Sequence, residues 1–276
     1  MPDAPTRSAA PSGGELFVIG LGPGNAGLLA PDALAALSAA DCIAGYSGYV
    51  DLVDPAILKG KEIIATGMRG EVERCEEAIG AARSGKKACL VCSGDPGVYA
   101  MAGLVLEMLH ARGLSLAEVP LTIVPGIPAV CAAAALLGAP LTHDFACVSL
   151  SDLLTEPEVI ERRLAHAFAA DFVVALYNPR SKKRRDNLAR AIGIAKRHRE
   201  GVTPVGHVRN AFRPDQEVTL STLAAFDPES ADMFSIILVG NGATAFLPAP
   251  GGVETDWGKG ARMYTPRGYG AKYHLE

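Results

Sequence analysis

The chain has 276 residues, of which 49% are hydrophobic and 20% charged, and its formal net charge is -4. This balance suits one or two globular domains and gives no argument for a nucleic-acid or membrane-surface partner. No apolar run approaches the length of a membrane span, and six cysteines are too few for a disulfide scaffold. We therefore expect a cytoplasmic protein with reduced thiols. Residues 1–14 are small, polar and rich in Pro and Gly, and predict a disordered leader rather than a signal peptide.

Apolar strands alternate with helical patterns through the first half of the chain. Strands are expected at 16–22, 63–66, 88–92 and 121–124, and helices at 31–40, 71–83 and 101–109. In the second helix, Val72, Cys75, Ile79 and Ala82 are expected on one buried face. Strands that are apolar on both faces and separated by helices are typical of a parallel sheet covered on both sides.

The second half of the chain has a different pattern. A small-residue helix in "PAVCAAAALLG" ends at Gly138, and Thr155 with Glu158 could form a capping box before another helix. Further strands are expected in "ACVSLS", "FVVALYN", "TPVGHVRN", "EVTLSTL" and "FSIILVGN". The stretches "TPVGHVRN" and "EVTLSTL" are too close in sequence for a helical crossover, and this spacing predicts an antiparallel hairpin. The sequence thus predicts a parallel α/β domain at 15–126, a mixed α/β domain at 127–246 and an irregular tail at 247–276.

The stretch "FVIGLGPGN" delivers a strand into a glycine-rich turn. Gly20 and Gly22 fit the dinucleotide fingerprint, but Asn25 stands where the third glycine belongs. Pro23 also removes a backbone donor that a pyrophosphate would need. No Gly-Lys-Ser/Thr follows, so a P-loop is excluded as well. Two interpretations remain for this turn, a ligand-free bend and a close-approach site for a ligand without phosphate.

The stretch "VCSGDPGVY" is a second turn that follows a buried-type strand. Its acid, Asp95, suits a ribose hydroxyl or an ammonium group, and Gly94 and Gly97 allow close backbone approach. Alternatively, Asp95 caps a helix that starts near Pro96. Because ligands bind at the carboxyl ends of strands in open parallel sheets, the two glycine turns could share one edge.

Four motifs together carry a resemblance to a known family. The stretches "VIGLGPGN", "SGDPGVYAMAG", "VPGIPA" and "LYNP" resemble the tetrapyrrole methylase family, and the resemblance runs from about Leu16 to Phe246. It implies two α/β domains with S-adenosyl-L-methionine folded into the cleft between them, and a homodimer. It also implies methyl transfer to a tetrapyrrole (precorrin) substrate, with S-adenosyl-L-homocysteine as the product.

The resemblance also carries over cofactor positions. Related methylases usually have hydroxyl residues where this chain has Pro128 and Ala129, so the chain departs from the family pattern there. The implied cofactor-binding residues are Pro23, Ser93, Gly94, Asp95, Val98, Pro128, Ala129, Tyr177, Asn178 and Gly206.

Two further stretches, "TGMRGEVERC" and the one running from "SLSDLL" to "RRDNL", look like the branch that methylates carbon-17 of precorrin-3B and contracts the macrocycle. That chemistry calls for a general base. Asp152 is the leading candidate, with a helix cap as its alternative role. Tyr46 and His143 are further catalytic candidates, against loop packing for the tyrosine and a structural role for the histidine. His207 is open to the same two interpretations.

Cationic side chains could hold the carboxylates of a polyacidic macrocycle. The candidates in the basic stretch 180–199 are Arg180, Lys182 and Arg184; a solvated helix face and an RNA-binding patch are the alternatives for that stretch. The remaining substrate-binding candidates are Arg69, Arg209 and Tyr49. Cys89 and Cys92 form a C-x-x-C whose members point to opposite faces of a strand, so both are expected in the core and no metal site is predicted.

Several functions therefore compete. The first is the ring-contracting carbon-17 methyltransferase, and the second is its cobalt-dependent counterpart acting on cobalt-factor III, or another precorrin methylase. A nicotinamide-dependent oxidoreductase is disfavoured by Pro23 and Asn25. A carrier that binds a tetrapyrrole without turnover is the fourth possibility.

Overall fold

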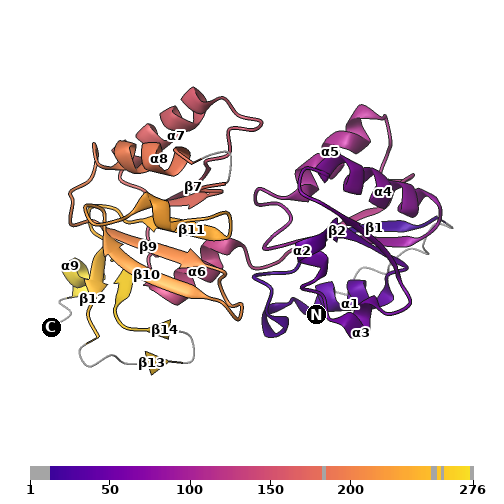
Figure 1. Ribbon diagram of the computed structural model, residues 1–276, viewed down its shortest axis with the longest axis horizontal. Helices are drawn as coiled ribbons and strands as arrows, with labels where there is room; N and C mark the ends of the chain where they lie inside the picture. The colour runs from indigo at the N-terminus through magenta and orange to yellow at the C-terminus, as the bar shows by residue number, and fades with distance from the viewer. Residues whose placement is uncertain (1–12, 182–184, 250–253, 256–257, 274–276) are drawn as a thin grey trace. The chain divides into compact units, whose positions relative to one another are not determined.

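The computed structural model describes residues 13–181, 185–249, 254–255 and 258–273. Most of the predicted leader lies outside these residues. The chain divides into two compact units, unit 1 from Met1 to Pro128 and unit 2 from Ala129 to Glu276. Both units are labelled by element in Figure 1. Within the described residues, no helix combines the length and the hydropathy that crossing a membrane requires.

Unit 1 is built on a five-stranded sheet in the order β3-β2-β4-β1-β5, and every neighbouring pair in it is parallel. The strands are β1 (Glu15–Gly20), β2 (Cys42–Tyr46), β3 (Glu62–Thr66), β4 (Lys87–Cys92) and β5 (Leu121–Val124). Because all five strands run in the same direction, their carboxyl ends meet at one edge of the sheet. The loops that carry the glycine motifs leave from this edge.

Helices cover both faces of this sheet (Figure 1). They are η1 (Ala26–Leu28), α1 (Pro31–Ala39), α2 (Ser47–Val50), α3 (Pro55–Leu58), α4 (Glu71–Arg83) and α5 (Met101–Ala111). Alternate strand residues enter two separate cores, so Val18 packs with the α4 and α5 side and Ile19 with the α1 side. Cys89 packs in the core on the α1 side, and Cys92 packs in the core on the α4 and α5 side. This confirms the prediction that they point to opposite faces of the strand.

Unit 2 is built on a mixed sheet in the order β10-β9-β11-β8-β7. The strands are β7 (Phe145–Ser149), β8 (Val173–Tyr177), β9 (Pro204–Arg209), β10 (Glu217–Thr222) and β11 (Ser235–Val239). Strands β7 and β8 are parallel, β11 is antiparallel to both β8 and β9, and β9 and β10 form the predicted antiparallel pair. The predicted fold class, a parallel-sheet domain followed by a mixed-sheet domain, is confirmed.

The helices of unit 2 lie on opposite faces of its sheet. They are α6 (Ala129–Leu137), α7 (Pro157–Ala169), α8 (Asn187–Ala195) and the short η2 (Pro228–Ser230). Helices α7 and α8 pack with Leu176 and Ile237, whereas α6 packs with Ala175 and Leu238, the alternate residues of the same strands. Each face of the sheet therefore has its own hydrophobic core.

The tail is more regular than expected. Strand β15 (Arg262–Tyr264) pairs with β12 (Ala245–Leu247) on one side and with β6 (Gly138–Ala139) on the other. Met263 on β15 is fully buried, which explains why this short segment is ordered against the rest of unit 2. Strands β13 (Glu254–Thr255) and β14 (Gly258–Lys259) form a separate pair, and α9 spans Tyr269–Tyr273. The expectation of an irregular tail is corrected for these segments.

One predicted helix start is wrong, and one alternative is excluded. Helix α7 has Glu156 at its N-cap without a side-chain cap and begins at Pro157, so Thr155 and Glu158 form no capping box. Proline is preorganised for the first helical position, which allows the helix to start without a polar cap. Helix α5 begins at Met101, as the apolar stripe predicted, so the alternative of a helix that starts near Pro96 is excluded.

Candidate active site

Three glycines pack backbone against backbone where β1, β4 and β5 end. A Cβ atom on Gly20 would lie 2.6 Å from the carbonyl oxygen of Gly94 and 2.7 Å from the amide nitrogen of Gly126. A Cβ atom on Gly126 would lie 2.3 Å from the same Gly94 oxygen. No other residue fits these positions without backbone movement. The glycine motifs therefore allow the three strand ends to converge.

The two predicted glycine turns are joined directly. The amide of Gly22 donates to the carbonyl of Gly94 at 3.1 Å, and the amide of Gly94 donates to the carbonyl of Gly22 at 2.7 Å. Both residues have positive φ angles, 63° and 71°. This antiparallel bridge confirms that the turns share one edge of the sheet, and it places Pro23 directly after the bridge.

The first turn does not have the geometry of a dinucleotide-binding turn. Asn25 caps only the short helix η1, where its Oδ1 accepts from the amide of Gly27 at 2.8 Å. The first long helix, α1, begins at Pro31. Its positive end is therefore displaced from the glycines, whereas a pyrophosphate site needs the helix to open on the third glycine.

Asp95 connects the loop after β4 to the loop after β5. Its Oδ1 accepts from the amide of Gly97 at 2.8 Å, and its Oδ2 accepts from the amide of Gly126 at 3.1 Å. The side chain is half-buried and does not cap α5, whose N-cap is Ala100. Because each carboxylate oxygen can accept more than one hydrogen bond, Asp95 keeps capacity for a hydroxyl or an ammonium group of a ligand.

Ser93 and Val98, the other cofactor candidates of this turn, flank Asp95 in the same loop. Both side chains are partly exposed. The amide of Val98 donates to the carbonyl of Asp95 at 3.3 Å, which closes the turn on itself. The structure therefore brings four of the predicted residues, Ser93, Gly94, Asp95 and Val98, into one short loop at the sheet edge.

Two predicted aromatic residues lie together at the carboxyl end of β2. The rings of Tyr46 and Tyr49 are 5.2 Å apart between centroids and meet edge to face at 85°. The guanidinium of Arg74 lies 5.9 Å from the centre of the Tyr46 ring. This arrangement offers an aromatic surface next to a cation.

Sequence reasoning missed Arg74. The predicted buried face of α4 began at Val72, but Val72 is 53% exposed, and Arg74 instead joins Cys75 and Ile79 in the buried set. A charged residue breaks the apolar pattern, so periodicity could not identify it. The one available signal was its position inside "TGMRGEVERC".

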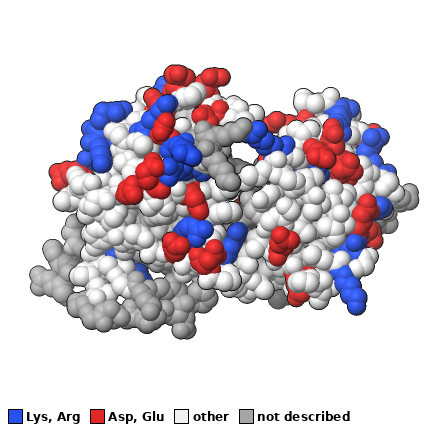
Figure 2. Space-filling view, viewed as in Figure 1, with Lys and Arg blue, Asp and Glu red and all other residues white. Residues whose placement is uncertain are grey.

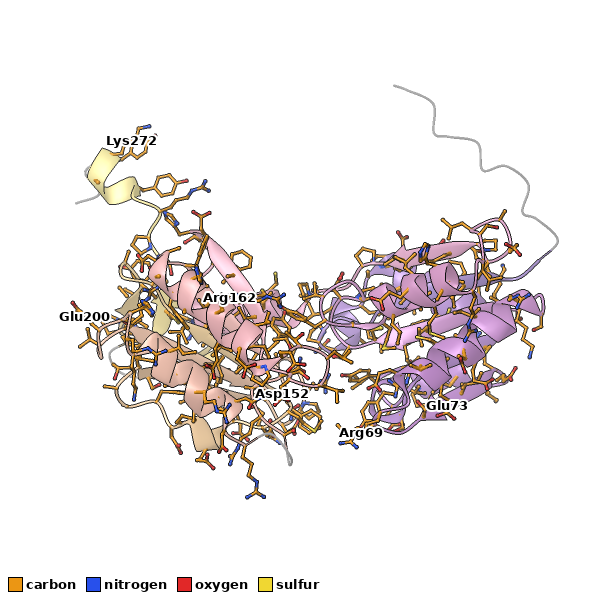
Figure 3. The ribbon with its side chains drawn as sticks, turned by 90° about the horizontal axis from the view of Figure 1, so that it is seen from above. Arg69, Glu73, Asp152, Arg162, Glu200 and Lys272 are labelled. Atoms are coloured by element: carbon orange, nitrogen blue, oxygen red, sulfur yellow. The ribbon has the colours of Figure 1, made fainter. Side chains whose placement is uncertain are left out.

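Arg69 lies in the loop between β3 and α4. It has a positive φ of 70° and an exposed side chain. Figure 3 shows its side chain extending away from the loop, while Glu73 lies on α4 itself. Arg69 is therefore accessible to solvent.

In unit 2, the end of β8 contacts the first turn of α6. The hydroxyl of Tyr177 accepts a hydrogen bond from the amide of Val130 at 2.9 Å. This satisfies one of the amides that a helix start leaves without an internal partner. Ala129 is the first residue of α6, and Pro128 directly precedes it.

Asn178, with a positive φ of 51°, donates from Nδ2 to the hydroxyl of Ser149 at 2.9 Å.

Gly206 has a packing role of its own. It lies inside β9, and a Cβ atom there would approach Leu137 Cδ1 to 2.5 Å and Leu137 Cγ to 3.1 Å. The missing side chain lets the end of α6 sit against the sheet. The glycine at this position therefore has a structural explanation independent of any cofactor.

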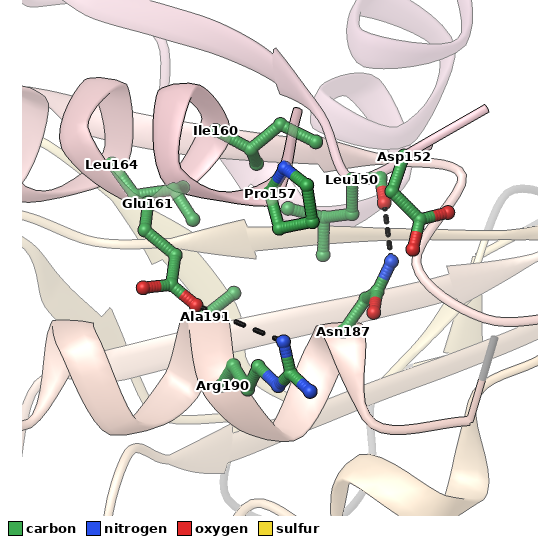
Figure 4. Close-up of a pocket in the computed structure, with 9 residues that line it drawn as sticks. All are labelled: Leu150, Asp152, Pro157, Ile160, Glu161, Leu164, Asn187, Arg190 and Ala191. Carbon is green, nitrogen blue, oxygen red and sulfur yellow. Dashed lines mark hydrogen bonds and ion pairs between the residues drawn. The ribbon is translucent and has the colours of Figure 1, made fainter. Parts of the chain in front are cut away.

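Asp152 follows the carboxyl end of β7. It lies at one end of a small pocket between α7 and α8, next to Leu150 and Asn187 (Figure 4). The Nδ2 of Asn187 donates to the carbonyl of Leu150 at 2.8 Å, which fixes the loop before Asp152 to the start of α8. Because α7 begins only at Pro157, Asp152 does not cap it, and the helix-cap alternative is excluded.

His143 is not brought together with Asp152. His143 precedes β7 and Asp152 follows it, and the five residues of the strand span about 17 Å at the usual rise per residue. The Nδ1 of His143 accepts from the amide of Asp144 at 2.8 Å, and the side chain lines a second pocket near Pro266 and Arg267. The structure therefore separates His143 from Asp152.

The cationic candidates of unit 2 are already paired. Arg180 donates to the carbonyl of Glu229 at 2.6 Å and forms an ion pair with the carboxylate of the same residue.

Arg209 contacts three acids, Asp232 at 2.8 Å, Glu217 at 3.1 Å and Asp215 at 3.7 Å. The hydrogen bond to Asp232 raises the pKa of Arg209. Their charges are thus balanced within unit 2. Lys182 and Arg184 lie outside the described residues.

The rest of the basic stretch has ordinary structural roles. Leu188 and Ile192 bury one side of α8, and Arg190 pairs with Glu161 on α7 at 3.9 Å. The side chain of Arg199 is 4% exposed and donates to the carbonyls of Phe168, Phe172 and Gly240. Figure 2 shows acidic and basic side chains interspersed over α7 and α8. This mixture favours the solvated-helix interpretation over an RNA-binding patch.

His207 is a core residue. It is 8% exposed, and its Nε2 lies 2.9 Å from the hydroxyl of Ser235, which in turn donates to Asp232. Burial lowers the pKa of His207, so the neutral ring is favoured. Serine occupies the middle of this chain of contacts, whereas a nucleophilic triad needs the histidine there. The arrangement is therefore structural.

The cysteines do not form a metal site. Burial raises the pKa of Cys89 to about 12 and that of Cys92 to about 11, and metal binding needs the thiolate. Within the described part of the chain, no cluster of three or more His, Cys, Asp or Glu side chains could hold a metal ion. Cys131, on the first turn of α6, is exposed.

Comparison with known proteins identifies the family. Residues 15–227 match the family of Tetrapyrrole (Corrin/Porphyrin) Methylases. The chain belongs to the tetrapyrrole methylase family. The resemblance inferred from the glycine motifs is confirmed, and the two joined turns of unit 1 are the part of this methylase that those motifs encode.

Curated relatives cover almost the whole methylase chain. It is 44% identical over 254 residues to the probable cobalt-factor III C(17)-methyltransferase of Salmonella typhimurium, which spans 92% of this chain and 99% of the relative. It is 40% identical over 257 residues to the precorrin-3B C(17)-methyltransferase of Sinorhizobium sp, with 93% and 97% covered.

Solved structures show the same fold. The crystal structure of the methyltransferase CobJ matches with a TM-score of 0.80 and 38% identity, and covers 92% of this chain and 100% of CobJ. The uroporphyrin-III C-methyl transferase from Thermus thermophilus, solved with S-adenyl homocysteine, matches with a TM-score of 0.62 and 22% identity, over 82% of this chain and 97% of that one. This second likeness supports the fold of the methylase alone.

Proposed function

We propose that this chain transfers a methyl group from S-adenosyl-L-methionine to carbon-17 of precorrin-3B, with contraction of the ring to give precorrin-4. The observation that carries the proposal is the similarity over nearly the full length to proteins named for carbon-17 methylation, at 40 to 44% identity. The likeness to CobJ across its whole chain supports the same conclusion.

The cobalt-containing counterpart of this substrate is the second candidate. The relatives from Salmonella typhimurium and Priestia megaterium, 44% and 41% identical, are both named for cobalt-factor III. The two reactions differ in whether the macrocycle already holds cobalt, so the metal would belong to the substrate. Incubation with each macrocycle in turn separates them, because the preferred substrate should show the higher kcat/KM.

The residues of unit 1 fit a nucleoside cofactor without phosphate. The glycine cluster of Gly20, Gly94 and Gly126 allows a ligand to approach the backbone, and Asp95 can accept from a hydroxyl or an ammonium group. Pro23 has no backbone N–H to donate, and a ligand without a pyrophosphate does not need that donor. We assign the cofactor to these residues of unit 1: Pro23, Ser93, Gly94, Asp95, Val98 and Pro128. In unit 2 we assign it to Ala129, Tyr177, Asn178 and Gly206.

S-adenosyl-L-methionine supplies an electrophilic methyl group on a sulfonium. For that step the protein has to hold the donor and acceptor carbons in line and exclude water. We assign packing against the macrocycle to Tyr46 and Tyr49, whose rings already meet edge to face. Asp152 is assigned the general-base role in ring contraction, accepting a proton at its carboxylate.

Two experiments test the proposal. Calorimetry should show binding of S-adenosyl-L-homocysteine and none of NAD; tight NAD binding without a response to the homocysteine product would favour an oxidoreductase. Incubation of precorrin-3B with S-adenosyl-L-methionine should give a product heavier by one methyl group. Unchanged mass with retained binding of the macrocycle would indicate a carrier.

We also propose, from the family resemblance, that the protein is a homodimer. Light scattering coupled to size-exclusion chromatography measures the mass directly. A mass of one chain, 28.7 kDa, at micromolar concentration would contradict the proposal.

A further inference from the structure

Unit 1 contains a buried cation at the carboxyl ends of β2 and β3. Arg74, on the first turn of α4, is 4% exposed. Its Nε donates to the hydroxyl of Thr66 at 2.8 Å, and its Nη2 donates to the carbonyl of Gly67 at 2.7 Å. Tyr46, whose ring lies against the guanidinium, is paired with Thr66 at the last position of both strands. The guanidinium therefore sits at the same sheet edge as the glycine cluster.

This cation has only neutral partners. Among the residues that the structure describes, no Asp or Glu oxygen lies within 4.0 Å of it, and its Nη1 donates to none of them. Arg199 in unit 2 provides a comparison within the same chain. The side chain of Arg199 is 4% exposed, and it pairs with Asp171 at 3.2 Å. Burial of a cation without an anionic partner is unfavourable, so Arg74 lacks the anion that its environment calls for.

The start of α4 is a second feature that favours an anion. This helix has thirteen residues, and its N-cap, Gly70, provides no side-chain hydrogen bond. The first amides of a helix carry a partial positive charge and need acceptors. A Cβ atom on Gly70 would lie 2.9 Å from the Thr66 hydroxyl, the same hydroxyl that Arg74 contacts. The uncapped helix start and the unpaired guanidinium thus meet at Thr66.

The surroundings describe the ligand further. Met68 and Val72 are 55% and 53% exposed, and Tyr49 packs on Tyr46. The cation thus contacts an aromatic ring, and accessible apolar side chains lie close to it in sequence, before and within the first turn of α4. This combination fits a carboxylate carried on a large, flat, apolar body better than it fits a free inorganic anion.

We propose that Arg74, together with the start of α4, forms a subsite for a carboxylate side chain of the tetrapyrrole substrate. The inference rests on the proposed function for the identity of the macrocycle. Nη1 donates to the carboxylate, and Tyr46 covers one face of the guanidinium beside it. Arg74 thereby fixes the orientation of the macrocycle and takes the substrate-binding role that Arg180 and Arg209, already paired with acids, do not fill.

The experiment compares two stable porphyrins that differ only in charge. Uroporphyrin III carries carboxylates, and the corresponding carboxamide porphyrin does not. Fluorescence titration measures the Kd of each for the full-length protein and for Arg74→Met. The variant should bind uroporphyrin III about 10- to 100-fold more weakly, as expected for loss of a charge-assisted hydrogen bond. Its affinity for the carboxamide porphyrin and for S-adenosyl-L-homocysteine should not change.

Arg83→Met is the matched control, because Arg83 is the exposed arginine in the last turn of the same helix. It should bind both porphyrins as the unmodified protein does. If Arg74 only anchors the loop at Thr66 and Gly67, Arg74→Met will weaken the binding of both porphyrins equally or of neither. Either result refutes the subsite. Should that variant fold poorly, Arg74→Lys replaces it, because lysine keeps the charge but lacks the planar guanidinium. Arg74→Lys must still weaken the binding of uroporphyrin III selectively.

The subsite and the proposed function can fail separately. Selective loss of uroporphyrin III binding in a protein that does not methylate precorrin-3B would support the subsite and contradict the proposed function. Full methylation of precorrin-3B, with equal porphyrin affinities in Arg74→Met and the unmodified protein, would contradict the subsite alone.

Discussion

The amide of Gly126 donates a hydrogen bond to the carboxylate of Asp95 at 3.1 Å, and this contact joins the loops that follow β4 and β5. The other oxygen of the same carboxylate is held by the amide of Gly97. Asp95 thus has a structural role and a proposed cofactor-binding role at one position, and the two can be separated by experiment.

We predict that Asp95→Asn both destabilises the protein and weakens S-adenosyl-L-homocysteine binding. An amide nitrogen in place of one oxygen faces a backbone donor, and an unmade buried hydrogen bond costs about 1–3 kcal/mol. Urea denaturation measures the free energy of unfolding, and calorimetry measures the Kd. Asp51→Asn, at an exposed position after α2, is the control and should change neither. Normal cofactor affinity in Asp95→Asn would limit Asp95 to the structural role.

Gly206→Ala should destabilise unit 2 by about 1–3 kcal/mol, the usual cost of overpacking. The reason is the approach of the new methyl group to Leu137. Adding Leu137→Ala should recover part of this loss, since the double variant removes the clash. Gly193→Ala on α8, where a Cβ atom would meet nothing within 4 Å, should instead raise the free energy of unfolding slightly. Additive effects of the two substitutions would show that the contact with Leu137 is not the cause.

Asp152→Asn should keep the affinity for S-adenosyl-L-homocysteine and slow ring contraction by about 100- to 10,000-fold, the usual contribution of a general base. Single-turnover assays with precorrin-3B separate methylation from contraction by product mass and spectrum. Glu156→Gln changes a neighbouring exposed acid that makes no cap to α7, and should leave both rates unchanged. Turnover at the normal rate in Asp152→Asn would exclude it as the base.

His207 predicts a pH dependence of stability. Its pKa in the folded protein is lowered mainly by burial, partly offset by Asp232 and Glu217, so the unfolded chain binds a proton more readily. The neutral ring contributes stability above the unfolded pKa of about 6.5. That contribution is lost as the pH falls through this value toward the folded pKa. Urea denaturation between pH 8 and pH 5 should therefore show a steeper loss of stability for the unmodified protein than for His207→Gln. Parallel curves would show that His207 is not responsible.

The sequence predicted the features that periodicity and glycine motifs encode. The strand that ends at Gly20 and the strand that ends before Gly94 follow from continuous apolar runs, and their meeting at one edge follows from parallel topology. The pairing of Met263 with Gly138 could not be foreseen, because a strand of three residues carries no periodic signal and its partner is far away in the chain.

The candidate site was predicted unevenly for similar reasons. The loop around Asp95 is local in sequence, so its motif was sufficient. His143 and Asp152 are close in sequence, but the strand between them separates them in space. Arg180 and Arg209 were chosen for their charge, and only the fold reveals the acids that pair with them. Arg74 was missed because a buried cation contradicts the rule that identifies buried residues.

The exposure of Cys131 has a practical consequence. The other cysteines of this chain are buried or partly buried, and all six lie within the described residues. A maleimide dye should therefore attach selectively to Cys131 without any cysteine being removed. The label would stand next to Val130, whose amide is held by the Tyr177 hydroxyl. Its emission would report in real time on events at the first turn of α6 when a ligand is added.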